Sequence, residues 1–352
     1  MEIRSRAPLR IGLAGGGTDL PSYSDNYGGS VVNVTIGMYA YCTIIPTDNG
    51  KIHFIAFDNS NNAEYDSAPR LEINDETLIL HKGVYNRIVK DYNNGKPLSF
   101  IMSTSNDAPV GSGLGTSSAM VVAILEAFNC WLNLGLDDYQ KAKLAFEIER
   151  IDLKLAGGKQ DQYASVFGGF NFIEFNTDKN TIVNAMRIKQ KTICEFECSL
   201  LLFHNNGKKH NSSEMQLALS ANILESQNIN TDKKVPTTLD ALEKLKENAY
   251  LMKNLILTGN LEGIAQAMRD GWEQKKKTSN IISNIELEKN IEFALANGAE
   301  AVKVTGAGGN GFLLLYCKPI NRQGLIDAFA KREGRIYPVK ICATGAESWT
   351  IN

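Results

Sequence analysis

The chain has 352 residues, a formal net charge of −2 and 43% hydrophobic residues. This length suggests two domains, and the composition is that of a globular protein with apolar cores. The small net charge gives no electrostatic support for nucleic acid or an anionic membrane as the main partner. No apolar run is long enough to span a membrane and no apolar signal region begins the chain, so we expect a soluble cytoplasmic protein. The six cysteines have neither Cys-x-x-Cys nor zinc-type spacing, which predicts reduced thiols.

The chain alternates predicted strands and helices along its whole length. In the first half the apolar patterns predict paired strands within 30–57, a helix over 78–92, a strand over 98–103, a nearly all-apolar helix over 117–132, a helix from 137 or 138 to 155, and a strand over 167–175. In the second half they predict exposed connection around a short helix within 204–236, helices over 239–257, 261–274 and 285–296, strands over 301–304 and 312–316, a helix over 322–332, and a strand over 335–342. This mixture predicts two α+β domains joined near residues 180–195.

A glycine-rich segment leads directly into the apolar helix predicted over 117–132. Gly111, Gly113 and Gly115 alternate with other residues, and hydroxyl residues 116–118 follow. Such a loop can turn its N–H groups inward over a helix N-terminus, which is a binding site for phosphate groups. The segment lacks the Gly-Lys-Ser/Thr of a Walker A loop, and its spacing is a poor dinucleotide fingerprint. The alternative is a glycine turn that serves only as a helix entry.

Two further glycine-rich segments lie near the ends of the chain. In residues 12–19 a glycine turn precedes Thr18 and Asp19, and Pro21 interrupts the helix that a dinucleotide loop requires. Asp19 could bind vicinal sugar hydroxyls, or it could only cap a tight turn. Residues 305–309 connect two predicted strands, either as a simple turn or as a loop closing over the same ligand.

Acidic residues follow on and after the second predicted helix. Glu147 and Glu149 are two residues apart, so they point to different sides of a helix and cannot easily share a ligand. Asp161 comes just after the glycine pair 157–158, in a turn from which it could enter a cleft. It could equally be the N-cap of a short helix that begins there.

Together these motifs resemble the GHMP kinase superfamily. The resemblance rests on residues 109–119, on residues 7–10 with Thr18 and Asp19, on residues 160–162 and on residues 303–309. It implies a two-domain α+β fold, with a ribosomal-protein-like N-terminal domain over 1–188 and a ferredoxin-like C-terminal domain over 189–352. Residues 13–23 resemble sugar kinases that act on D-glycero-D-manno-heptose 7-phosphate. This narrower likeness implies ATP-dependent phosphorylation at C1, giving the 1,7-bisphosphate for surface polysaccharide synthesis.

The resemblance also implies roles for the matching residues. Asp161 and Arg10 would be catalytic, and Ser117 and Glu149 would hold Mg²⁺. The residues implied to bind ATP are Gly111, Ser112, Gly113, Leu114, Gly115, Thr116, Ser117, Ser118, Gly306 and Gly308. The residues implied to bind the sugar are Asp19, Gly16, Gly17, Thr18 and Lys159. Gly16 and Gly17 stand where galactokinase has a Glu-His pair, which disfavours galactose.

A phosphorylated sugar also needs cations at its far end. By location and charge the candidates are Arg4, Arg6, Lys159, Lys208, Lys209 and His210, although a Lys pair in an Asn-rich stretch is more often a solvated loop. The competing functions are another sugar kinase for fucose or a free hexose, a non-catalytic sensor of sugar and ATP, and a nicotinamide oxidoreductase built on residues 12–17. The oligomeric state stays open, a homo-oligomer included.

Overall fold

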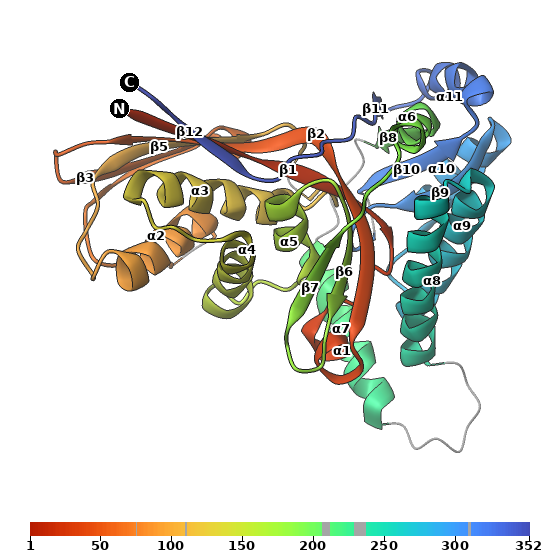
Figure 1. Cartoon of the computed structure of the whole chain (residues 1–352), viewed down its shortest axis with the longest axis horizontal. Helices are drawn as coiled ribbons and strands as arrows, with labels where there is room; N and C mark the ends of the chain where they lie inside the picture. The colour runs from red at the N-terminus through yellow and green to blue at the C-terminus, as the bar shows by residue number, and fades with distance from the viewer. Residues whose placement is uncertain (75, 110, 206–211, 229–236, 309–310) are drawn as a thin grey trace.

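The computed structural model describes residues 1–74, 76–109, 111–205, 212–228, 237–308 and 311–352. Figure 1 shows two regions, each with one sheet and its own helices. None of the helices in these ranges is long and apolar enough to cross a membrane. All six cysteines are free, as the sequence predicts.

The first region is built on an eight-stranded sheet of order β12-β1-β2-β5-β3-β4, with β6 paired to β2 and β7 paired to β6. Its pairs are antiparallel except that of β3 with β5. The strands are β1 (Glu2–Ala14), β2 (Gly29–Pro46), β3 (Lys51–Ala56), β4 (Asn61–Asp66), β5 (Phe100–Asn106), β6 (Phe170–Phe175), β7 (Thr181–Ala185) and β12 (Glu347–Ile351).

The expected pairing within residues 30–57 is wrong. β2 and β3 both form, but β5 lies between them. The 18-residue β2 pairs with β6 through its first residues and with β5 through its last, while β1 runs along its other edge. Alternation identifies a strand but not its partner, because partners are chosen by contacts distant in sequence.

Helices cover one face of this sheet (Figure 1). They are α2 (Ile79–Tyr92), α3 (Thr116–Leu132), α4 (Asp138–Glu147) and α5 (Gln160–Phe167), with a 3₁₀ turn at Phe57–Asn59 and a π-helix at Ile148–Asp152. The short helix α1 (Pro21–Tyr27) instead packs against residues 219–223 and 242–245. α3 is buried along most of its length, as its nearly continuous apolar sequence predicts. Asp137 caps α4, but the helix predicted to continue to residue 155 instead changes to the π-helix after Glu147.

The second region holds a four-stranded antiparallel sheet of order β11-β8-β10-β9. Its strands are β8 (Leu200–His204), β9 (Ala299–Val304), β10 (Phe312–Cys317) and β11 (Arg335–Pro338). Its helices are α6 (Gln190–Ser199), α7 (Ser212–Asn228), α8 (Thr238–Thr258), α9 (Leu261–Thr278), α10 (Ile285–Ala296) and α11 (Arg322–Phe329), with a 3₁₀ turn at Pro319–Asn321. The helix expected to be short, α7, has 17 residues.

The C-terminal strand β12 returns to the first sheet and pairs with β1, with Arg6 opposite Glu347. The chain therefore starts and finishes in the same region (Figure 1). Both regions combine a sheet with helices, so the α+β prediction is confirmed. The boundary between residues 188 and 189 remains a prediction.

Candidate functional site

The glycine-rich segments at 111–115 and 305–308 lie directly against each other. The N–H of Phe312 donates to the Ser112 carbonyl over 2.9 Å. Gly113 has a φ of +77°, and a Cβ there would lie 2.3 Å from the Thr305 carbonyl oxygen. A Cβ on Gly306 would lie 2.8 Å from the Gly113 Cα. Only glycine permits this approach of two backbones, so the two loops form one wall.

A cavity of about 510 Å³, here called the loop cavity, opens against this wall. Residues of the predicted phosphate loop line it, namely Gly111, Gly113, Gly115, Thr116, Ser117 and Ser118. α3 begins at Thr116, so its N-terminal N–H groups lie at the cavity. Ala56 and residues 78–80 add an apolar end. A helix N-terminus beside an apolar recess suits a ligand that joins a polyanion to a flat apolar group, as a nucleoside triphosphate does.

Three residues predicted to bind ATP lie behind the wall of the loop cavity. Ser112 and Leu114 are 1% and 0% exposed. Their carbonyls accept from Phe312 and from the N–H of Arg10, which anchors the loop to β10 and β1. Gly308 lies against Ile282, whose carbonyl oxygen would be 2.9 Å from an added Cβ. For these residues a supporting role fits better than ligand contact.

Asp161 and Arg10 meet at the edge of the loop cavity. Arg10 Nε donates to Asp161 Oδ1 over 2.7 Å, and Nη2 lies 2.6 Å from the same oxygen. Arg10 is 4% exposed, whereas the Asp161 side chain keeps 19% of its surface. Asp161 lies in the first turn of α5, whose N-cap is Lys159, so neither the open turn nor the N-cap expected at Asp161 is correct.

Ser117 and Glu149 also lie together. Ser117 Oγ donates to Glu149 Oε1 over 2.8 Å, and the Gln162 amide donates to Oε2. Glu149 is 0% exposed, on the π-helix. Glu147 instead pairs with Arg87, which confirms that the two glutamates point apart.

The pair of Ser117 and Glu149 fits Mg²⁺. The described residues contain no group of three His, Cys, Asp or Glu that could form a metal cage. Mg²⁺ does not need one, since it binds through one or two protein oxygens and takes its other ligands from phosphates and water. Ser117 lines the loop cavity, where those phosphate ligands would lie.

A second cavity, of about 40 Å³ and here called the aspartate cavity, also has Asp161 in its wall. Asp19, Gly16 and Gly17 also line it. Asp19 accepts hydrogen bonds from the N–H of Gly17 over 3.0 Å and from the N–H of Gln160 over 3.2 Å, which fix its carboxylate. The Thr18 hydroxyl instead donates to backbone carbonyls and holds the turn.

The cations proposed from the sequence for a sugar phosphate have other partners or lie outside the described residues. Lys159 Nζ lies 2.5 Å from Asp25. Arg4 and Arg6 pair with Glu2 and Glu347 near the β12 edge of the sheet. Lys208, Lys209 and His210 lie outside the described residues.

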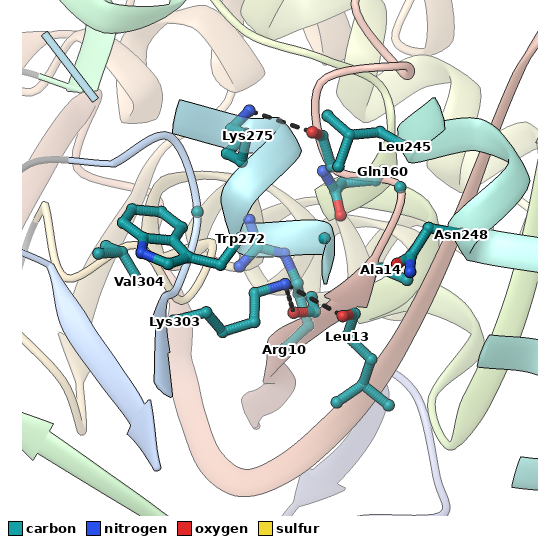
Figure 2. A pocket seen from close by; sticks show the side chains of 15 residues that line it. Arg10, Leu13, Ala14, Gln160, Leu245, Asn248, Trp272, Lys275, Lys303 and Val304 are labelled. Atoms are coloured by element: carbon teal, nitrogen blue, oxygen red, sulfur yellow. Dashed lines mark hydrogen bonds between the residues drawn. The ribbon is translucent and has the colours of Figure 1, made fainter. Parts of the chain in front are cut away.

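Two lysines that the sequence did not single out line a third cavity of about 40 Å³, here called the lysine cavity (Figure 2). Lys303 Nζ donates to the carbonyls of Gly12 and Leu13 over 3.1 and 3.0 Å, and Lys275 Nζ donates to that of Gly16 over 3.1 Å. Burial lowers the pKa of Lys303 to about 7, helped by the nearby charges of Lys275 and Arg10. Burial also lowers the pKa of Lys275 to about 8.

His81 and Asn106 also line the loop cavity, at its apolar end, and no sequence motif indicated them. A hydrogen bond of 2.8 Å joins His81 Nε2 to Thr104 Oγ1, and burial lowers the pKa of His81 to about 4. The imidazole is therefore neutral near pH 7. Asp58 holds the Asn106 amide over 2.8 Å. In sequence these positions have the pattern of ordinary core residues, because α2, β3 and β5 come together only in the fold.

Comparison with known proteins places this site in a family. Residues 80–169 match the GHMP kinases N terminal domain, and residues 239–332 match the GHMP kinases C terminal domain. The chain is 42% identical to the D-glycero-alpha-D-manno-heptose 7-phosphate kinase of Campylobacter jejuni, over 99% of both chains. The chain belongs to the GHMP kinases.

Solved structures agree with this membership. A D-glycero-D-manno-heptose 1-phosphate kinase from Bacteroides thetaiotaomicron superposes with a TM-score of 0.83 at 41% identity, covering 99% of each chain. Lactococcus lactis galactokinase complexed with galactose superposes with a TM-score of 0.77 at 16% identity, covering 98% of this chain and 95% of that one, and shows the fold alone. The GHMP kinase fold predicted from the motifs is confirmed, and the oxidoreductase alternative is wrong.

Proposed function

We propose that this GHMP kinase transfers the terminal phosphate of ATP to the C1 hydroxyl of D-glycero-D-manno-heptose 7-phosphate. The 42% identical relative of the same length supports the substrate. The observation that carries the reaction is the position of Asp161, which lines both the loop cavity and the aspartate cavity. A carboxylate at this junction contacts the hydroxyl of a sugar on one side and the end of a triphosphate on the other.

Asp161 is suited to receive the proton. Its Oδ1 contacts Arg10, whereas no hydrogen-bond donor among the described residues occupies Oδ2. The C1 hydroxyl oxygen forms a bond to the γ-phosphorus, the bond from that phosphorus to the bridging oxygen of ADP breaks, and the hydroxyl proton passes to Asp161. Catalysis of this kind depends mainly on positioning and charge neutralisation.

The loop residues and the two metal-binding candidates act on the nucleotide. The N–H groups at the start of α3 bind the phosphates, and Gly306 closes the loop cavity from the second region. Ser117 and Glu149 would hold Mg²⁺, which would supply positive charge to neutralise the phosphates. Arg10 keeps Asp161 oriented and adds positive charge beside the transferred group.

The sugar occupies the aspartate cavity. Asp19 accepts hydrogen bonds from its hydroxyls, and Gly16 and Gly17 leave room for it against the backbone. The reaction needs both regions, because Gly306 and Lys275 of the second region line this cavity together with residues of the first. We therefore retain domains over 1–188 and 189–352, with β12 added to the sheet of the first, and a cytoplasmic location where ATP is available.

A coupled ADP-release assay across a sugar panel tests this function. The panel contains D-glycero-D-manno-heptose as its 7-phosphate, as its 1-phosphate and unphosphorylated, together with L-fucose and free hexoses. We expect the highest kcat/KM with the 7-phosphate and a 1,7-bisphosphate product by NMR. The 1-phosphate is included because the similar Bacteroides structure carries that name. Equal turnover of fucose or free hexoses would contradict the heptose assignment.

A further inference from the structure

The three cavities adjoin one another around Arg10 and Gly306, which line all of them. The loop cavity and the aspartate cavity share Asp161 in their walls. The aspartate cavity and the lysine cavity share Gly16, Gln160 and Lys275. A substrate in the aspartate cavity whose reacting hydroxyl lies at Asp161 can therefore also reach the lysine cavity.

The lysine cavity concentrates positive charge. Lys275 comes from α9 and Lys303 from β9, and Arg10 of β1 lines the same space (Figure 2). Within the described residues both ammonium groups donate only to backbone carbonyls, and neither forms an ion pair. The nearest acidic influence is that of Asp19 on Lys275. Arg10 is neutralised by its pair with Asp161, whereas the two lysines repel each other, and this cost is recovered when an anion binds between them.

Donor groups of the lysine cavity remain available to such an anion. An ammonium has three donors, of which Lys275 uses one and Lys303 two. The volume of about 40 Å³ exceeds the roughly 10–15 Å³ that one water requires, so a small tetrahedral anion fits.

We propose that Lys275 and Lys303 bind the 7-phosphate of the sugar and so select a phosphorylated heptose over a free sugar. This inference rests on the proposed function. In the cyclic form, which carries the C1 hydroxyl, C7 lies on an arm outside the ring. A sugar in the aspartate cavity with its C1 hydroxyl at Asp161 can therefore place its 7-phosphate at the two lysines. The same arrangement explains why Lys159, paired with Asp25, is not needed for this phosphate.

A purely structural role is the competing explanation. Both lysines donate to carbonyls of residues 12–16, and they could act only by holding this glycine-rich turn. Loss of the turn would disturb phosphorylated and unphosphorylated sugars alike, because Gly16 and Gly17 border the aspartate cavity. Loss of a phosphate contact would affect only the phosphorylated sugar.

The test compares Lys303→Met and Lys275→Met with Lys276→Met as the matched control. Lys276 neighbours Lys275 on α9 but pairs with Glu273 over 2.8 Å and lines none of the three cavities. For each folded variant, kcat/KM and the dissociation constant are measured with D-glycero-D-manno-heptose 7-phosphate and with the unphosphorylated heptose, and KM is measured for ATP. If a methionine variant does not fold, the same measurements are made on Lys303→Arg or Lys275→Arg, which keep the positive charge.

We expect each methionine variant to bind the 7-phosphate about 10- to 100-fold more weakly, the effect of losing a charged hydrogen bond. Affinity for the unphosphorylated heptose and KM for ATP should stay within about threefold of the wild type, and Lys276→Met should resemble the wild type. The arginine variants should keep the preference for the phosphorylated sugar. Equal losses on both sugars, or no loss on the 7-phosphate, would overturn the inference. A wild-type enzyme that does not phosphorylate the 7-phosphate would instead refute the proposed function.

Discussion

Arg10 joins the carboxylate of Asp161 to the glycine loop. Two of its nitrogens lie 2.6 and 2.7 Å from Asp161 Oδ1, and Nη1 donates to the Gly113 carbonyl over 2.6 Å. Because the guanidinium is planar and rigid, it fixes the distance between the carboxylate and the loop that faces the phosphates. The proposed proton acceptor and the proposed phosphate site are therefore held in one geometry before any substrate binds.

Asp161→Asn tests the carboxylate. The amide keeps the size of the side chain but cannot accept the hydroxyl proton, so kcat should fall about 10²- to 10⁴-fold with little change in KM for ATP. Asp152→Asn is the control, because Asp152 also pairs with an arginine, Arg87, but lies outside the three cavities. Steady-state kinetics with unfolding midpoints for both variants measure the effect. A wild-type kcat in Asp161→Asn would remove Asp161 from the reaction.

Ser117→Ala tests the metal site. Loss of its hydroxyl removes one proposed ligand and the hydrogen bond to Glu149. Mutation of a residue that only hydrogen-bonds a metal ligand already weakens metal binding about 10- to 100-fold. Half-maximal activity of Ser117→Ala should therefore require at least about tenfold more Mg²⁺. Ser165→Ala removes another buried hydroxyl, which donates to the Pro8 carbonyl away from the cavities, and should leave the Mg²⁺ titration unchanged. Identical titrations for Ser117→Ala and the wild type would mean that the serine only orients Glu149.

The parts of the site that the sequence predicted are those encoded locally. The alternating glycines followed by an apolar run fix both the loop and the start of α3, because each feature constrains the backbone where it occurs. The glycines before Asp161 indicated a cleft residue, and the alternative of a short helix there agrees with α5, except that Lys159 rather than Asp161 is its N-cap. Glu149 was a predicted site residue, but the π-helix that carries it was not predicted. A change of helix type leaves no periodic signal in the sequence.

The lysine cavity could not be predicted from local patterns. It forms where α9 and β9 meet the end of β1 and the turn that follows it. Lys275 is 259 residues from Gly16, and Lys303 is 291 residues from Gly12. Lys275 stands in a run of three lysines at the end of a helix, a pattern typical of a solvated helix terminus. Lys303 belongs to the motif at residues 303–309, but nothing in that motif indicates that its ammonium donates to the carbonyls of residues 12 and 13.

Gly158→Ala tests whether sugar phosphorylation depends on the position of the Asp19 carboxylate. A Cβ on Gly158 would lie 1.8 Å from Asp19 Oδ2, so either the carboxylate or the segment before α5 must move. A displacement of about 1 Å at a reacting geometry costs about 10²-fold, so kcat/KM for the sugar should fall by about that factor. KM for ATP should change little, because Asp19 does not line the loop cavity. Gly324→Ala on α11, where an added Cβ meets nothing within 4 Å, is the neutral control. Unchanged sugar kinetics in Gly158→Ala would exclude Asp19 as a sugar ligand.

The pH dependence of sugar binding should follow the two lysines. Lys303 and Lys275 have pKa values lowered to about 7 and about 8, so they are charged below these values and lose their protons as the pH rises through them. The other charged groups at their cavities are Arg10, Asp19 and Asp161. A sugar phosphate is dianionic above its second pKa of about 6. The value of kcat/KM for the 7-phosphate should therefore peak between about pH 6 and 7 and fall toward pH 9.

The variants separate this pH effect from others. In Lys303→Met the fall above pH 7 should become smaller and move toward the pKa of Lys275, while the acid limb stays in place because it belongs to the substrate. With unphosphorylated heptose the wild-type profile should lack the alkaline fall altogether. These profiles are measured as log kcat/KM against pH at constant ionic strength, since screening weakens the attraction between the lysines and the phosphate. An alkaline fall of equal size with both sugars would assign the titration to a group other than the lysines.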